Sequence, residues 1–217
     1  MNRSKLTIAE FLFQCGLRIN NSLNDSKVQE AVSVFGYTAE RLEAGRNILD
    51  ASNALNETFV KEYGELDAAY EQRNEAKDLA NFKFQGHLAV ARIVFKSNPS
   101  ASTALALNKP LPRTNSEWFT RSRAFYNNLL SNAEWLAAMA DYNAGEEMLK
   151  SVLADIQGVE NYSDVIMREK GDAQNATKER DAKLEELNEW VNDYESIAKI
   201  ALNEKPQLLE KLGIVVK

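Results

Sequence analysis

The chain has 217 residues, of which 44% are apolar and 27% are charged, and its formal net charge is -6. This composition is typical of a folded globular protein and excludes a disordered chain. The negative balance repels phosphate backbones, so we expect no binding to nucleic acid. Nine glycines and four prolines are few for this length, and this shortage of turn residues predicts an all-α fold.

The sequence also lacks the marks of secreted and membrane proteins. Its single cysteine, Cys15, excludes an internal disulfide and leaves a zinc knuckle or a redox pair without a second thiol. No segment approaches the roughly 18 consecutive apolar residues of a membrane span. The first apolar patch is interrupted by Glu10 and Gln14, unlike a secretory signal. We therefore expect a cytoplasmic protein that does not bind membranes.

Residues 1–25 predict a leading helix and a loop. Thr7 and Glu10 have the spacing of a capping box, in which a hydroxyl and a carboxylate satisfy free N–H groups at the start of a helix. The helix that follows is apolar on several sides, so it has to be buried by the end of a bundle or by another copy of the chain. We therefore expect self-association through this helix. The residues of this candidate contact are Ile8, Phe11, Leu12 and Phe13.

The prolines divide the rest of the chain into two long proline-free tracts. A single helix over residues 27–97 would extend about 100 Å, so a hairpin is the compact alternative. Apolar residues at alternating steps of three and four give each tract two amphipathic arms. The sequence therefore predicts a single domain, an antiparallel up-and-down four-helix bundle made of two hairpins. Its parts are residues 26–98 (first hairpin), 99–114 (connector), 115–205 (second hairpin) and 206–217 (short capping helix and tail).

Local signals support this division. Ser26 with Gln29, and Thr114 with Glu117, fit the capping box and predict helix starts. The clearest apolar seam lies in the last arm and predicts the face that is buried there. Its residues are Leu184, Leu187, Val191, Tyr194, Ala198 and Ala201.

The two tracts also suggest an internal repeat. An offset of 107 in residue number pairs Pro99 with Pro206, whereas an offset of 94 pairs Ala39 with Ala133. The difference, 107 minus 94, is 13, about one extra heptad in each arm of the second hairpin. We therefore predict that the second hairpin is longer and that its overhang, near residues 150–183, is available to a partner. Chance recurrence of common helix residues is the alternative.

The end of the chain carries a resemblance. Pro206 can begin a short closing helix with Gly213 as its left-handed cap, and residues 99–107 would be the counterpart. The segments Glu189–Tyr194, Ile197–Leu202 and Pro206–Ile214 resemble the ending of uncharacterised bacterial proteins of tandem helical-hairpin type. This resemblance implies a fold of helical hairpins, and no activity comes with it.

The residues needed for common catalytic and metal sites are missing from the sequence. His87 is the only histidine, whereas a di-iron bundle needs two Glu-x-x-His pairs and an HExxH site needs two histidines. No P-loop, GxGxxG motif or GxSxG elbow is present. We therefore predict no catalytic residue, no cofactor and no metal.

These observations favour a non-catalytic protein that acts in protein interaction or scaffolding. The alternative is a small-molecule-binding bundle, or an enzyme, with a pocket near His87 and Tyr194, which pair at the offset of 107. His87 can equally be a buried residue of aromatic size with one ring nitrogen satisfied. A cavity lined by these side chains favours the ligand, and a tightly packed seam favours scaffolding.

Overall fold

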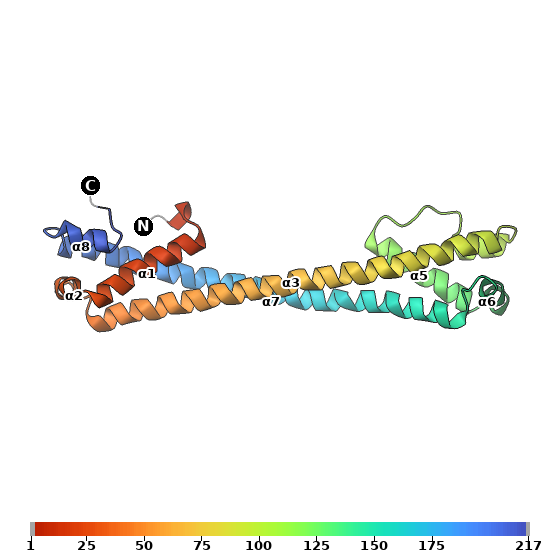
Figure 1. Cartoon of the computed structure of the whole chain (residues 1–217), viewed down its shortest axis with the longest axis horizontal. Coiled ribbons are helices and arrows are strands. Elements are labelled where there is room, and N and C mark those ends of the chain that lie inside the picture. Colours follow the sequence, from red (N-terminus) through yellow and green to blue (C-terminus); the bar gives the residue numbers. More distant parts are fainter. Residues whose placement is uncertain (1–2, 216–217) are drawn as a thin grey trace. The chain divides into compact units, whose positions relative to one another are not determined.

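A computed structural model describes residues 3–215, and these residues form helices and connecting turns without any strand (Figure 1). The all-α prediction is therefore confirmed. The elements in chain order are the 3-10 helix η1 (Arg3–Lys5) and the α-helices α1 (Ile8–Asn24), α2 (Ser26–Ser33), α3 (Ala39–Val94), α4 (Pro99–Ala104), α5 (Asn115–Leu130), α6 (Ala133–Ala140), α7 (Glu146–Ala201) and α8 (Pro206–Lys211).

The predicted hairpins are wrong. Residues 39–94 form one unbroken helix of 56 residues, and residues 146–201 form another of the same length. No proline or capping signal interrupts either tract, and a glycine alone costs a helix only about 1 kcal/mol. The prediction of a longer second hairpin is therefore also wrong, and residues 150–183 lie within α7 rather than in an overhang.

The chain divides into two compact units. Unit 1 consists of residues up to Gly64 and from Gly171 onward, and unit 2 consists of Glu65–Lys170. In unit 1, α1, α2 and α8 lie beside the start of α3 and the end of α7 (Figure 1). Unit 2 holds the end of α3, the start of α7, and α4, α5 and α6. Each unit therefore combines one end of α3 with the opposite end of α7.

The element boundaries recur at a constant offset in residue number, the offset of 107 that pairs Pro99 with Pro206. Helices α2, α3 and α4 begin and end at positions that this offset carries onto the bounds of α6, α7 and α8. Two pairs of residues with left-handed backbone, Gly36 with Asn143 and Ala106 with Gly213, are separated by the same offset. The offset of 94 is wrong, because Ala39 begins α3 whereas Ala133 begins α6. Positions related by the offset of 107 therefore occupy corresponding places in these helices, without an insertion between them, and we call them equivalent.

The helix ends follow the local sequence at most of the predicted positions. Thr7 and Glu10 form the predicted capping box of α1, and Thr114 caps α5. The box predicted at Ser26 is wrong, because Asp25 is the N-cap of α2 and its carboxylate accepts a hydrogen bond from the Lys27 amide at 3.0 Å. The short closing helix begins at Pro206 as predicted.

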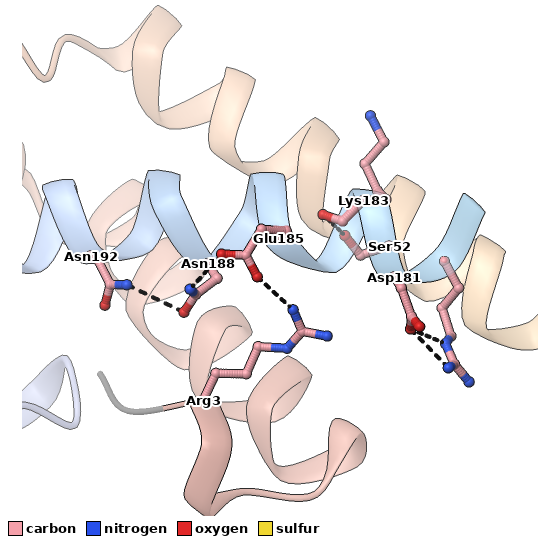
Figure 2. Close-up of polar contacts among 8 residues, drawn as sticks. Arg3, Ser52, Asp181, Lys183, Glu185, Asn188 and Asn192 are labelled. Carbon is pink, nitrogen blue, oxygen red and sulfur yellow. Dashed lines mark hydrogen bonds and ion pairs between the residues drawn. The ribbon is translucent and has the colours of Figure 1, made fainter. Parts of the chain in front are cut away.

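The core of unit 1 is built around the last arm of the chain. Five of the six residues of the seam predicted there are buried, and Ala201 is half-buried against the same core. Leu184, Leu187 and Val191 pack with residues of α1, whereas Tyr194 and Ala198 pack with residues of α2 and α8. Polar contacts on α7 border this core (Figure 2). The Arg3 guanidinium donates to Glu185 at 2.9 Å, and the buried Ser52 hydroxyl of α3 donates to the Lys183 carbonyl oxygen at 3.5 Å. Apolar burial supplies most of the stabilisation, because exposed ion pairs contribute little.

The core of unit 2 contains more aromatic side chains than the core of unit 1. Phe84 of α3 packs edge-to-face against Phe125 of α5, with ring centroids 5.5 Å apart. Leu88, Tyr126 and Ile156 are fully buried in the same cluster. Three long segments, from α3, α5 and α7, therefore close this unit around one apolar centre.

Replacement of Gly64 or Gly171 by alanine should stabilise the protein. Outside its own helix backbone, neither position has an atom within 4 Å of an added Cβ. Because alanine has the higher helix propensity, we expect the free energy of unfolding in urea to rise by about 1 kcal/mol for each substitution. Gly45→Ala is the control and should lose stability, since its Cβ would lie 2.4 Å from the Trp190 ring. A loss of stability at Gly64 or Gly171 would contradict the unbroken helices.

Candidate functional site

The structure places His87 and Tyr194 in different units. His87 belongs to the end of α3 in unit 2, and Tyr194 belongs to the end of α7 in unit 1. Each contacts a hydroxyl group of its own unit: Nδ1 of His87 lies 2.9 Å from the Tyr126 hydroxyl, and the Tyr194 hydroxyl bonds to that of Ser22. The two residues occupy equivalent positions, and they do not share one pocket.

Tyr194 is enclosed by other rings. It is fully buried, it stacks on Trp190 with centroids 5.4 Å apart, and Tyr37 lies at 5.1 Å. Burial raises the pKa of its hydroxyl to about 12. The Trp190 ring reaches so close to Gly45 that a Cβ there would overlap it. The groove between α3 and α7 in unit 1 is therefore filled by the protein itself.

His87 lines an open pocket in unit 2. The pocket has a volume of about 940 Å³ and lies between the end of α3 and the start of α7. We call it the His87 pocket. It is lined by Phe82, Lys83, Gln85, Gly86, His87, Met148, Ser151 and Val152.

The His87 pocket presents little net charge. Burial, and to a smaller extent the charge of Lys83, lowers the pKa of His87, so the imidazole is neutral at pH 7. The Lys83 ammonium pairs with the Asp155 carboxylate at 2.7 Å. Phe82 and Met148 are exposed apolar side chains at the rim. An apolar ligand with few polar groups suits such a lining.

A second feature of unit 2 is an apolar stripe on the outer side of α3. It consists of Leu79, Phe82, Gly86, Ala89 and Ile93, all exposed, and we call it the outer stripe. The side chains of Leu79, Phe82 and Ile93 are 66%, 81% and 66% exposed. The steps between them alternate between three and four residues, which keeps them on one helical face. The sequence carries this signal in the spacing of these residues, but the prediction of one apolar seam in each arm does not include a second face.

The equivalent face of α7 in unit 1 is polar. The residues that the offset of 107 pairs with the outer stripe are also exposed, but three of the five are acidic. They are Glu186, Glu189, Asp193, Ser196 and Ile200. The apolar character of the outer stripe is therefore a property of unit 2, and the fold does not require it.

The leading helix contributes mainly to the core. Phe11 and Leu12 are buried beside Cys15, and Ile8 is packed against the same cluster. Phe13 alone among the four candidates for self-association is largely exposed, at 72%. Contact with another copy through Phe11 or Leu12 would require α1 to leave unit 1.

Comparisons with models of protein families, with curated proteins and with solved structures find no match for this chain. In the part of the chain that the structure describes, no helix is both long and apolar enough to cross a membrane. The function therefore has to be inferred from the geometry of each unit.

Cys15 should not react with alkylating reagents in the folded protein. Its thiol is fully buried, and burial raises its pKa to about 12, so very little thiolate forms at neutral pH. We expect iodoacetamide to modify Cys15 only after denaturation, which mass spectrometry of the intact chain can measure. Modification of the native protein at the denatured rate would contradict the placement of α1 in the core.

Substitution of His87 by phenylalanine should destabilise unit 2. The change removes the hydrogen-bond partner of the buried Tyr126 hydroxyl, which costs about 1–3 kcal/mol in the free energy of unfolding. The double variant His87→Phe/Tyr126→Phe is the control, because it removes both partners. We expect its loss to be smaller than the sum of the two single losses. Additive losses would show that the two groups do not interact.

The same pair predicts a pH dependence. The pKa of His87 is lowered in the folded state, so the unfolded chain binds the proton first as the pH falls. The stability contributed by neutral His87 is present above its ordinary pKa of about 6.5 and decreases below it. The thermal midpoint of the native protein should therefore fall more steeply between neutral and mildly acidic pH than that of the phenylalanine variant. Parallel curves would show that His87 does not titrate in this way.

Proposed function

We propose that this protein acts without catalysis, through protein–protein contact, in the cytoplasm, and that the outer stripe of unit 2 is its contact surface. The observation that carries the proposal is the contrast between the apolar outer stripe and its acidic equivalent on α7. Exposed apolar surface lowers solubility, and a contiguous patch on a soluble domain is typical of an interaction site.

The core of unit 2 does not use the outer stripe. The same segment of α3 buries Ala80, Phe84, Leu88 and Ala91 on its inner side. With 3.6 residues per turn, these positions lie on the side of the helix opposite the outer stripe. Helix α3 is therefore apolar on two opposite faces in unit 2. The inner face is buried within the chain, and the outer face is exposed.

The pattern of residue sizes suits a second copy of the same chain. Two small residues, Gly86 and Ala89, occupy the middle of the stripe, and larger ones flank them. In an antiparallel pair centred between them, Gly86 faces Ala89 of the second copy, and Phe82 faces Ile93 of the second copy. Small residues then meet at the centre, where two helices approach most closely, while the large ones pack around them.

The mass of the protein in solution tests this contact. We expect light scattering to give twice the mass of one chain for the native protein and the mass of a single chain for Leu79→Glu/Ile93→Glu. Both side chains are exposed and outside the His87 pocket, so circular dichroism should show unchanged helix content.

Two matched controls locate the contact. Ile200→Glu changes the equivalent face of α7, and Phe13→Glu changes the exposed residue of the leading helix; neither should alter the mass of the dimer. A native protein that remains a single chain at the highest soluble concentration would contradict the proposal. So would dissociation by Phe13→Glu with an intact dimer in the double variant.

A further inference from the structure

The groove between α3 and α7 in unit 1 shows what this framework can hold. There the Trp190 ring stacks on Tyr194 with an interplanar angle of 23°. Its edge meets Tyr37 at a centroid distance of 5.7 Å and an angle of 78°. On its other side the ring passes over Gly45, where a Cβ would lie 2.4 Å away. A flat bicyclic ring therefore fits between the two helices.

Unit 2 lacks both of the rings that fill this place. At the offset of 107, Lys83 stands where unit 1 has Trp190, and Ala144 stands where it has Tyr37. The Lys83 side chain turns to Asp155 instead of crossing the groove. The His87 pocket opens at the positions equivalent to the filled groove, so its volume corresponds to side chains that unit 2 does not supply.

We propose that the His87 pocket binds a small, neutral, planar aromatic molecule of about the size of indole, which takes the place that Trp190 fills in unit 1. The pocket volume of about 940 Å³ accommodates such a molecule with room to spare. Phe82 and Gly86 of α3, with Met148 and Val152 of α7, supply apolar walls. Aromatic and apolar contacts with a flat ring stabilise it in the same way as the stacked rings of unit 1.

Two residue differences between the units determine where the ligand lies in the pocket. Val152 replaces Gly45, so the ring cannot approach α7 as closely as Trp190 approaches α3 in unit 1. Lys83 replaces Trp190 and leaves the outer part of the groove open. The ligand therefore lies nearer the mouth of the pocket, beside the exposed Phe82 and Met148.

The polar groups of the pocket set the charge of the ligand. His87 is held by Tyr126 through Nδ1, which leaves Nε2 as the ring atom that it can offer to a ligand. The imidazole is neutral, and the charge of Lys83 is balanced by Asp155. A neutral heterocycle with one hydrogen-bonding group suits this lining better than an ion, which would lose its hydration without a partner.

Titration of the full-length protein with indole, followed by calorimetry, tests the proposal. We expect saturable binding of indole by the native protein, and at least about tenfold weaker binding of cyclooctanol, an aliphatic molecule of similar size. Lys83→Trp restores the residue of unit 1, fills the pocket and should weaken indole binding by at least about tenfold. Gln72→Trp, which adds the same ring at an exposed position of α3 outside the pocket, is the matched control and should bind like the native protein.

A reverse variant provides an independent test. Trp190→Ala opens the equivalent groove of unit 1 beside Gly45, and we expect a second equivalent of indole to bind. If this variant does not fold, Lys83→Trp alone decides the question. Absence of indole binding by the native protein, or equal binding by Lys83→Trp, would overturn the proposal. Tighter binding of N-acetyltryptophanamide than of indole would also overturn it, because it would indicate a peptide as the ligand.

The outer stripe and the His87 pocket share Phe82 and Gly86, so each proposal is tested at residues that belong to only one of them. Lys83 lies outside the outer stripe, so the mass of Lys83→Trp should remain that of the native protein. Leu79 and Ile93 do not line the pocket, so their double variant should still bind indole. Loss of one property without the other identifies which proposal has failed.

Discussion

The continuity of α3 and α7 is the constraint on which both units depend. Each of these helices has 56 residues, and its two ends are buried by different sets of short helices. A helix of this length is stable in water only when most of its apolar face is covered, because helix propensity alone contributes little. Unit 1 cannot form without the end of α7, and unit 2 cannot form without the end of α3. A break inside the part of a long helix that belongs to one unit would therefore separate elements that its core requires, whereas a break at Gly64 or Gly171 would leave each core with its own segments.

The two units share one backbone framework and differ in the side chains that fill it. In unit 1 the buried Arg18 lies 3.6 Å from Glu195 and also donates to the Gly213 carbonyl oxygen. The equivalent positions in unit 2 are Phe125 and Leu88, which belong to its apolar core. An ion pair and a pair of apolar side chains can fill the same space, because buried charges are tolerated when they compensate each other. The same framework therefore accommodates a buried ion pair in one unit and apolar side chains in the other.

Some of this architecture could be predicted from the sequence. The seam of the last arm, from Leu184 to Ala198, is buried as its spacing indicates, because a stripe at steps of three and four has one face to bury. The caps at Thr7 and Thr114 follow from hydroxyl and carboxylate spacing, which acts within one turn of helix. Features that depend on neighbouring residues of one helix can therefore be predicted from the sequence.

The rest depends on contacts between distant segments. Continuity through Gly64 and Gly171 could not be decided locally, since the residues on both sides are compatible with one helix or with two arms. The sequence indicates a pocket near His87 as an alternative, but its origin depends on pairing Gly45 with Val152, whereas the offset of 94 pairs Gly45 with Met139. The contrast between a filled and an open groove appears only when equivalent positions are compared at the correct offset.

The order of the segments along the chain also sets the order in which the protein can fold during synthesis. Unit 2 is one continuous stretch, Glu65–Lys170, so all of its partners have left the ribosome before α7 is complete. Unit 1 can complete its folding only later, because the segment that ends at Gly64 packs with the segment that begins at Gly171. The apolar side of α1, including Phe11 and Cys15, therefore lacks its partners from α7 while the whole of unit 2 is translated. Apolar surface left open in this way during synthesis is the kind of surface that chaperones bind.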